Sequence, residues 1–267
     1  MTWLNRRAWL PMAAGWMVIA ACGGGDAEAN SDANADAQMA AVEPAKNTLT
    51  PEEEAAGWIV LFDGVSTDGW RGYNQESFPE EGWAVGDGDL IVFASDGSEA
   101  GLGGDIVTEQ TFADFELVFD FQVSPVGNSG VFYRVQEHEG LDLWMVAPEF
   151  QVLDDTAYIE MGTMDMNKHL TGDNYDLHAS VVTASNPIGE WNHARILVDG
   201  AHVEHWLNGQ LTVEYELWSP EWQALVDGSK FAPHPEYAAA REGRIGIQDH
   251  GHEIRYKNIK IRPLNGS

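Results

Sequence analysis

Alternating polar and apolar positions predict a series of short β-strands from residue 57 to the end of the chain. In residues 115–123 the apolar side chains are Leu117, Phe119, Phe121 and Val123, and polar residues fill most of the positions between them. Successive side chains of a strand point to opposite faces of a sheet, so this pattern predicts a strand with one buried face. Further strands are expected at residues 58–62, 83–85, 89–93, 130–135, 149–154, 194–198, 203–207, 211–215, 244–248 and 254–262.

The segments between the predicted strands indicate an antiparallel arrangement. Asn208-Gly209 separates two alternating runs, which predicts a two-residue hairpin turn, and residues 86–88 predict another hairpin. One short helix is expected at residues 219–230, where a Ser-Pro pair provides a start. Many hairpin-linked strands with one minor helix predict an all-β antiparallel sandwich, most simply a jelly roll.

The N-terminal residues have the pattern of a lipoprotein signal peptide. Arg6-Arg7 precede an apolar run that ends at Ala21-Cys22, and this run is too short to span a membrane stably. We expect residues 1–21 to be removed after Sec or twin-arginine export, and Cys22, the only cysteine, to carry a lipid. The predicted location is the bacterial cell envelope, in the outer membrane or the periplasm.

The segment after the predicted lipidation site is rich in small and acidic residues. Residues 22–56 contain almost no aromatic or β-branched residues, and such a composition cannot bury enough apolar surface to order the chain. We therefore expect a disordered acidic tether at residues 22–56 and a single folded domain at residues 57–267.

The charge of the chain restricts its partners. With 14 basic and 43 acidic residues the net charge is −29, and loss of residues 1–21 removes two arginines and no acid, which leaves −31. This field repels nucleic acid and anionic lipid, so contact with a membrane is expected only through the lipid anchor. A carbohydrate is neutral and indifferent to the field.

Sequence motifs for common cofactors are absent from the chain. It has no Gly-rich phosphate loop, no His-Glu-x-x-His, no Gly-x-Ser-x-Gly elbow and no clustered His/Cys set. His202 and His205 would face opposite sides of a strand, which makes them poor joint ligands. No cofactor is therefore predicted, and no metal ligands are assigned.

Two predicted strands carry polar side chains that suggest a site. Arg134 would share a face with Gly130 and Phe132, where it offers a donor fork for an oxyanion or an ion pair within the sheet. The order Glu149-x-Gln151-x-x-Asp154 is similar to the catalytic strand of laminarinase-type retaining glycosidases, although the middle residue is Gln. Asp154 has the wrong parity unless a β-bulge intervenes, and it could equally begin a turn.

Two further segments add candidates. Gln248 and His250 lie opposite the apolar face of the strand at residues 244–248, and His250 could act as an acid or a base near neutral pH. The long irregular stretch at residues 156–187 offers His169 and Tyr175 to line a cleft. Trp191 is either a stacking platform for a sugar or a core residue.

The segments at residues 128–134, 149–154, 171–177 and 243–251 occur together with further short motifs along the chain, and in this order they resemble the 3-keto-disaccharide hydrolase family. Tyr256 and Lys257 stand where the family usually has Phe and Arg. The resemblance covers residues 57–264, and it implies a concanavalin A-like jelly roll with a sugar cleft on one sheet and cleavage of glycosides oxidised at C3. The motifs lie at residues 57–64, 69–70, 114–117, 128–134, 149–154, 171–177, 189–192, 207–209, 229–231, 243–251 and 254–261.

The implied chemistry needs one base, one acid and donors for an enolate oxygen. We expect His250 or Glu149 to be the base, Arg134 with Gln151 or Gln248 to bind the oxyanion, and His169 or Tyr175 to protonate the leaving group. One alternative is a non-catalytic carbohydrate-binding jelly roll, and another is an ordinary retaining glycosidase that uses Glu149 and Asp154. A purely structural surface protein fits poorly with so polar a sheet face.

Overall fold

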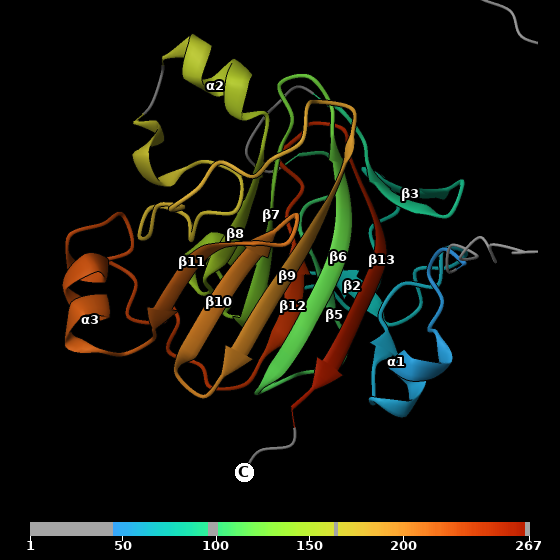
Figure 1. Ribbon diagram of the computed structural model, residues 1–267, viewed down its shortest axis with the longest axis horizontal. Coiled ribbons are helices and arrows are strands. Elements are labelled where there is room, and N and C mark those ends of the chain that lie inside the picture. Colours follow the sequence, from blue (N-terminus) through green and yellow to red (C-terminus); the bar gives the residue numbers. More distant parts are fainter. Residues whose placement is uncertain (1–44, 96–100, 163–164, 265–267) are drawn as a thin grey trace, which may run out of the picture. The chain divides into compact units, whose positions relative to one another are not determined.

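The computed structural model describes residues 45–95, 101–162 and 165–264. The expected signal peptide, Cys22 and most of the expected tether lie outside these residues and remain predictions. Two antiparallel sheets pack face to face and form a β-sandwich of the jelly-roll class, as the sequence predicted (Figure 1). None of the helices in the described ranges is long and apolar enough to cross a membrane.

The larger sheet, sheet A, has eight strands in the order β11-β10-β9-β6-β13-β4-β3, with β1 paired to β13. Its strand β6 shows the predicted alternation, with every second side chain buried. The rings of Phe119 and Phe121 contact Phe150 of the opposite sheet at centroid distances of 5.6 and 6.5 Å. The strands are β1 (Ile59–Val60), β3 (Trp83–Gly86), β4 (Asp89–Val92), β6 (Phe115–Val123), β9 (Trp191–Asp199), β10 (His202–Leu207), β11 (Gln210–Glu216) and β13 (Ile254–Pro263).

The smaller sheet, sheet B, has the order β2-β5-β12-β7-β8. Figure 1 shows α2 above β7 and β8, and α3 beside the edge strand β11 of sheet A. The strands of sheet B are β2 (Trp70–Gly72), β5 (Ile106–Thr108), β12 (Arg244–Ile247), β7 (Asn128–Val135) and β8 (Glu149–Leu153). The helices are α1 (Pro51–Ala55), α2 (Asp155–Met161) and α3 (Pro220–Asp227), with 3₁₀ turns η1 (Leu143–Met145) and η2 (Met166–Lys168).

The predicted hairpin turn between β10 and β11 is confirmed. Asn208 and Gly209 both have positive φ, 49° and 77°. A two-residue turn of this kind matches the right-handed twist of the flanking strands, and Asn followed by Gly is the pair that adopts it at the lowest cost.

Apolar residues cover part of the outer face of sheet B. A second buried cluster on this face joins strand residues to the segment that contains η1. The rest of the outer face carries polar side chains, so the packing of η1 limits the space available for a site. The buried cluster consists of Val107, Phe132, Val135, Leu143, Val146 and Ala147.

The folded part begins before residue 57, which corrects the expected extent of the tether. The helix α1 has a capping box between Thr50 and Glu53. The Glu53 carboxylate also pairs with Lys260 Nζ of β13 at 2.7 Å, which ties the helix to sheet A. These contacts order a segment whose composition is too poor in apolar residues to predict a folded element.

Candidate functional site

Strand register brings three polar segments together on the outer face of sheet B. Gly130 of β7 pairs with Gln151 of β8, and the Gln248 N–H donates to the Gly130 carbonyl at 3.0 Å. Phe132 pairs with Glu149 in the neighbouring row. Because directly paired residues point to the same face, Gln248, Gly130 and Gln151 form one row across three strands.

The missing side chain of Gly130 leaves room for the Glu149 carboxylate. A Cβ atom at residue 130 would lie 2.1 Å from Glu149 Oε1 and 2.7 Å from its Cδ. The carboxylate therefore rests over the backbone of β7, in the row that joins Gln151 and Gln248. Glu149 is only 6% exposed.

Glu149 and seven further residues line a narrow cavity around this carboxylate, which we call the polar pocket. Its free volume is about 30 Å³, and it adjoins a wider cavity of about 330 Å³ that shares Trp144 and Gln248. Five residues predicted from the sequence line the polar pocket, namely Glu149, Gln151, Tyr175, Gln248 and His250. The sequence reasoning missed Asn128, Trp144 and Lys230.

Lys230 brings a cation to the polar pocket. Its Nζ lies 4.3 Å from the ring centroid of Trp144 and 4.3 Å from that of Tyr175. An ammonium group over aromatic faces is held by the ring quadrupole. The sequence offered a signal for Asn128 and for Lys230, because both fall within motifs of the family resemblance. It offered none for Trp144, which falls in no motif and in no alternating run.

Asp249 holds the turn that carries His250. Its fully buried carboxylate accepts the N–H groups of Leu102, Gly103 and Gly251 at 2.8 to 3.0 Å. A Cβ atom at Gly101, whose φ is +56°, would lie 1.9 Å from Asp249 Oδ1. This packing fixes the segment after β12 at the border of the polar pocket.

His169 lies behind Tyr175 and does not line the polar pocket. The two rings contact at a centroid distance of 4.5 Å. His169 Nε2 lies 3.3 Å from Asp176 Oδ1. The other oxygen of Asp176, Oδ2, accepts a hydrogen bond from the backbone N–H of Lys230 at 3.2 Å. His169 is therefore placed to position Tyr175 and the backbone at Lys230.

Arg134 points away from the polar pocket, which corrects the expectation that it shares a face with Phe132. Its φ is +55°, and the register between β7 and β12 shifts beside it, so β7 carries a β-bulge. The buried guanidinium donates to the carbonyls of Ala113 and Gly200 and to Asp114 Oδ1 at 2.8 to 2.9 Å. The ion-pair interpretation fits this placement, and the oxyanion role does not.

Replacement of Arg134 by Met is expected to destabilise the fold by about 2–4 kcal/mol, because it removes the three hydrogen bonds of a buried guanidinium to Ala113, Gly200 and the partly exposed Asp114. Turnover per folded molecule should stay within a few-fold of the wild type. Denaturant unfolding and activity at low temperature would measure both. Arg241→Met is the control, since Arg241 also lies over Trp218 but should cost far less stability. A large loss of turnover in a folded Arg134→Met variant would contradict the structural role.

Asp154 and Trp191 also lie outside the polar pocket. Asp154 caps α2, where its carboxylate accepts the N–H groups of Ala157 and Val126 at 3.0 and 2.9 Å, so it begins a turn. It lines a separate cavity beneath α2. Trp191 lies under Lys257 Nζ, 3.8 Å from its ring centroid, on the outer face of sheet A. Glu149 and Asp154 are therefore not the paired carboxylates of a retaining glycosidase.

His205 is buried behind the site, and His178 is partly buried. His205 Nε2 lies 2.9 Å from the Tyr133 hydroxyl, and burial lowers the pKa of His205 to about 3. His178 stacks on Tyr215 at 4.6 Å, and burial lowers its pKa to about 4. Both rings are thus neutral in the folded protein at physiological pH.

Acid is expected to destabilise the protein through these two histidines. Their unfolded pKa is near 6.5, so below that pH the unfolded chain binds protons that the folded chain excludes. The resulting stability is complete above about pH 6.5 and falls by up to about 1.4 kcal/mol per pH unit for each histidine until the folded pKa is reached. Urea unfolding as a function of pH measures the slope. His205→Gln should reduce it, and an unchanged slope would contradict this explanation.

Comparisons with known proteins agree with the fold and with the family resemblance of the sequence. Residues 57–262 match the model of a family described as a 3-keto-alpha-glucoside-1,2-lyase-like domain. A 3-keto-disaccharide hydrolase from Bacteroides thetaiotaomicron is 33% identical over 276 residues, which cover 93% of this chain and 95% of the relative. A proposed glycosyl hydrolase from Parabacteroides distasonis is 33% identical, with a TM-score of 0.74 over 82% of this chain and 100% of that one. Another from the same organism is 25% identical, with a TM-score of 0.55 over 78% and 84% of the two chains.

Proposed function

The chain belongs to the 3-keto-disaccharide hydrolase family, and from this premise we propose that its polar pocket cleaves glycosides that carry a ketone at C3. The observation that carries the proposal is the Glu149 carboxylate held over Gly130, with Lys230 and His250 lining the same pocket. This set provides a base, a cation and a proton donor around one small space. The relatives named above support the substrate class.

The reaction that fits this set is an elimination. A ketone at C3 acidifies the C2 proton, so a base can remove it and the electron pair forms an enediolate. The enediolate expels the leaving group at C1 as a double bond forms between C1 and C2, and the leaving oxygen takes a proton. Addition of water across that double bond completes a net hydrolysis. Each proton transfer is a task for a positioned side chain.

We assign the base to Glu149, because it is the only carboxylate among the described residues that line the polar pocket. Lys230, with the amides of Gln151 and Gln248, binds the enediolate oxygen, the role first expected of Arg134. His250 lies at the border of the pocket and protonates the leaving oxygen. An ordinary retaining mechanism needs a second carboxylate at about 5–5.5 Å, and no other carboxylate in the described ranges lines this pocket.

The two adjoining cavities bind different parts of the substrate. The polar pocket is too small for a whole sugar, so it receives only the reacting edge, from C1 to C3. The wider cavity has walls of Tyr73, Leu143 and Trp144 together with polar side chains, and its 330 Å³ suits the rest of a disaccharide. Aromatic walls beside polar groups are typical of sugar sites, where C–H faces stack and hydroxyls find partners.

Paired substrates test the proposed function. The purified protein is incubated with a 3-keto-glucoside and with its unoxidised parent, and release of the leaving group is followed for both. Release from the keto form alone supports the proposal. Release from both forms would indicate an ordinary glycosidase, and binding of sugar without release would favour the carbohydrate-binding module.

Replacement of Lys230 by Met is expected to lower kcat/KM for the keto substrate by about 10²–10³-fold, as removal of an oxyanion donor does elsewhere. Lys230→Arg should recover part of the loss, since it restores the cation. Lys257→Met is a matched control, because Lys257 also lies over a tryptophan but on the outer face of sheet A. Equal activity in the two Met variants would exclude Lys230 from the reaction.

We also propose that the protein works at the cell envelope, held by a lipid on Cys22. The support is the sequence of the N-terminal residues. Cell fractionation tests this location, since a Cys22→Ser variant should move from the membrane fraction to the soluble fraction.

A further inference from the structure

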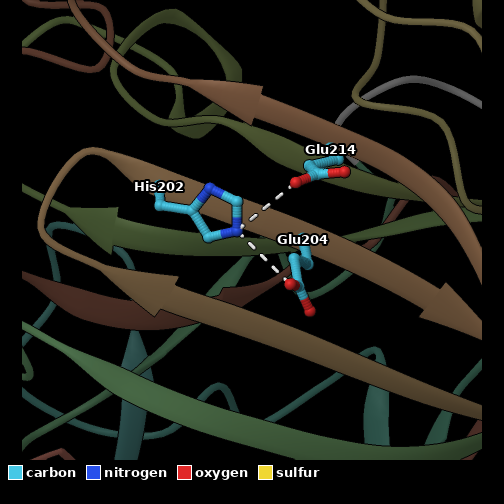
Figure 2. Close-up of side chains that lie close together, drawn as sticks. All are labelled: His202, Glu204 and Glu214. Atoms are coloured by element: carbon cyan, nitrogen blue, oxygen red, sulfur yellow. Dashed lines mark hydrogen bonds and ion pairs between the residues drawn. The ribbon is translucent and has the colours of Figure 1, made fainter.

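A histidine and two glutamates converge on the outer face of sheet A (Figure 2). The polar pocket lies on the other sheet, sheet B. His202 and Glu204 lie on β10, and Glu214 lies on β11. The alternation of β10 places Val203 and His205 in the core, so His202 and Glu204 face outward. We propose that these three side chains bind a divalent transition-metal ion with the preferences of zinc.

The spacing of the three ligand atoms suits such an ion. His202 Nε2 lies 3.3 Å from Glu204 Oε1 and 3.8 Å from Glu214 Oε1. All three atoms lie within 4.8 Å of one another. Zinc takes imidazole nitrogen and carboxylate oxygen at about 2.0–2.2 Å in tetrahedral geometry, which separates its ligand atoms by about 3.4 Å. Movement of the exposed Glu214 side chain toward the other two ligands would complete the geometry, with water as the fourth ligand.

Neighbouring side chains already orient two of the three ligands. His202 Nδ1 lies 2.8 Å from Glu216 Oε1, which turns Nε2 toward the two glutamates. The far oxygen of Glu204, Oε2, accepts from Trp206 Nε1 at 2.7 Å and from Arg195 Nη1 at 3.1 Å. Glu204 Oε1 is thereby directed at His202. Metal-binding histidines commonly have a carboxylate on the second ring nitrogen in this way.

Charge favours an ion at this place. Glu204 and Glu214 are directly opposite each other in the register of β10 and β11, where like charges destabilise a strand pair. β11 is also the last strand in the order of sheet A, so the pair lies at its edge. Glu214 is exposed, which gives an ion access. A bound ion would offset the repulsion and join the two strands.

The test is zinc binding by the whole chain, purified without an affinity tag and stripped with a chelator. Calorimetric titration with zinc chloride should show one saturable site, and zinc should raise the melting temperature. His202→Gln and Glu214→Gln should each weaken binding by at least about tenfold. His193→Gln is the matched control and should bind zinc like the wild type, since His193 is an exposed histidine of β9 that contacts the single carboxylate of Asp120.

Two outcomes would overturn the proposal. A wild-type protein that takes up no zinc would show that the cluster is an ion-pair network only. Equal binding by the wild type and both variants would place the ion elsewhere. Cleavage of the keto substrate should be unaffected in His202→Gln, because the cluster and the polar pocket lie on different sheets, so this test stands apart from the test of the proposed function.

Discussion

Replacement of Glu149 by Gln is expected to lower kcat/KM for a 3-keto-glycoside by at least about 10³-fold, because the amide cannot take the C2 proton and general base catalysis contributes 10²–10⁴-fold. The change keeps the shape of a side chain that rests over Gly130, so the melting temperature should change little. Steady-state kinetics and thermal unfolding on the same preparation measure both.

Asp154→Asn is the control for this variant. Asn caps helices about as well as Asp, and Asp154 lies outside the polar pocket, so activity should be retained. A retaining glycosidase that used both carboxylates would lose activity in both variants. An active Glu149→Gln protein would instead transfer the role of base to His250, the alternative that the sequence left open.

Replacement of Gly130 by Ala is expected to lower kcat/KM by about 10²-fold or more while the fold remains intact. The new Cβ would occupy the position of the Glu149 carboxylate, 2.1 Å from Oε1, and displacement of a reacting group by about 1 Å costs this much. The three atoms nearest the new Cβ, Oε1, Cδ and Cγ, all belong to the Glu149 side chain and none to the backbone, so rotation of that side chain relieves the overlap and the loss of stability should be small. Kinetics and urea unfolding measure the two effects.

Gly246→Ala is the matched control, because it adds the same methyl group to the same face of the neighbouring strand. Its Cβ would meet Leu143 at 3.2 Å and Phe132 at 3.4 Å, so it should affect stability more than turnover. The double variant Gly130→Ala/Glu149→Gln should be no worse than Glu149→Gln alone, because both changes remove the same group. Additive losses would show that Gly130 acts other than by placing Glu149.

The two predictions separate the mechanism from the fold. Loss of activity in Glu149→Gln and in Gly130→Ala, with unchanged stability, would mean that the Glu149 carboxylate takes part in the reaction. The neutral histidines His178 and His205 do not line the polar pocket, so they contribute to the stability of the fold, and their effect should appear in unfolding at acid pH.

Much of the fold could be predicted because the alternation of apolar and polar residues shows which face of a strand is buried. The run at residues 115–123 and the turn at Asn208-Gly209 specify their own structures locally, since one face of a half-buried strand must be apolar and a tight hairpin turn needs positive φ. The short helices α1 and α2 show no apolar alternation. A capping box and the ion pair between Glu53 and Lys260 of β13 stabilise α1, and the Asp154 cap begins α2.

The sequence predicted the parity of Glu149, Gln151 and Gln248 correctly. The pairing of β7 with β8 runs without a shift, and the register shift between β7 and β12 lies at Arg244, away from Gln248. It could not place Lys230 and Trp144 in the same pocket, since these residues come from connecting segments about 85 positions apart in the chain, and only the packing of those segments on sheet B unites them.

At two places the register was decided only by the tertiary structure. A bulge at Arg134 turns its side chain from the polar pocket into the sandwich, and a shift between His205 and Trp206 sets Glu204 opposite Glu214, where an unbroken hairpin would set Val213. A slip of one residue reverses every following side chain between the faces of a sheet. The sequence by itself determined which residues are apolar, where the chain turns and which polar groups are available. The tertiary structure decided which of those polar groups come together, because the packing of the two sheets sets where the β-bulges and register shifts occur.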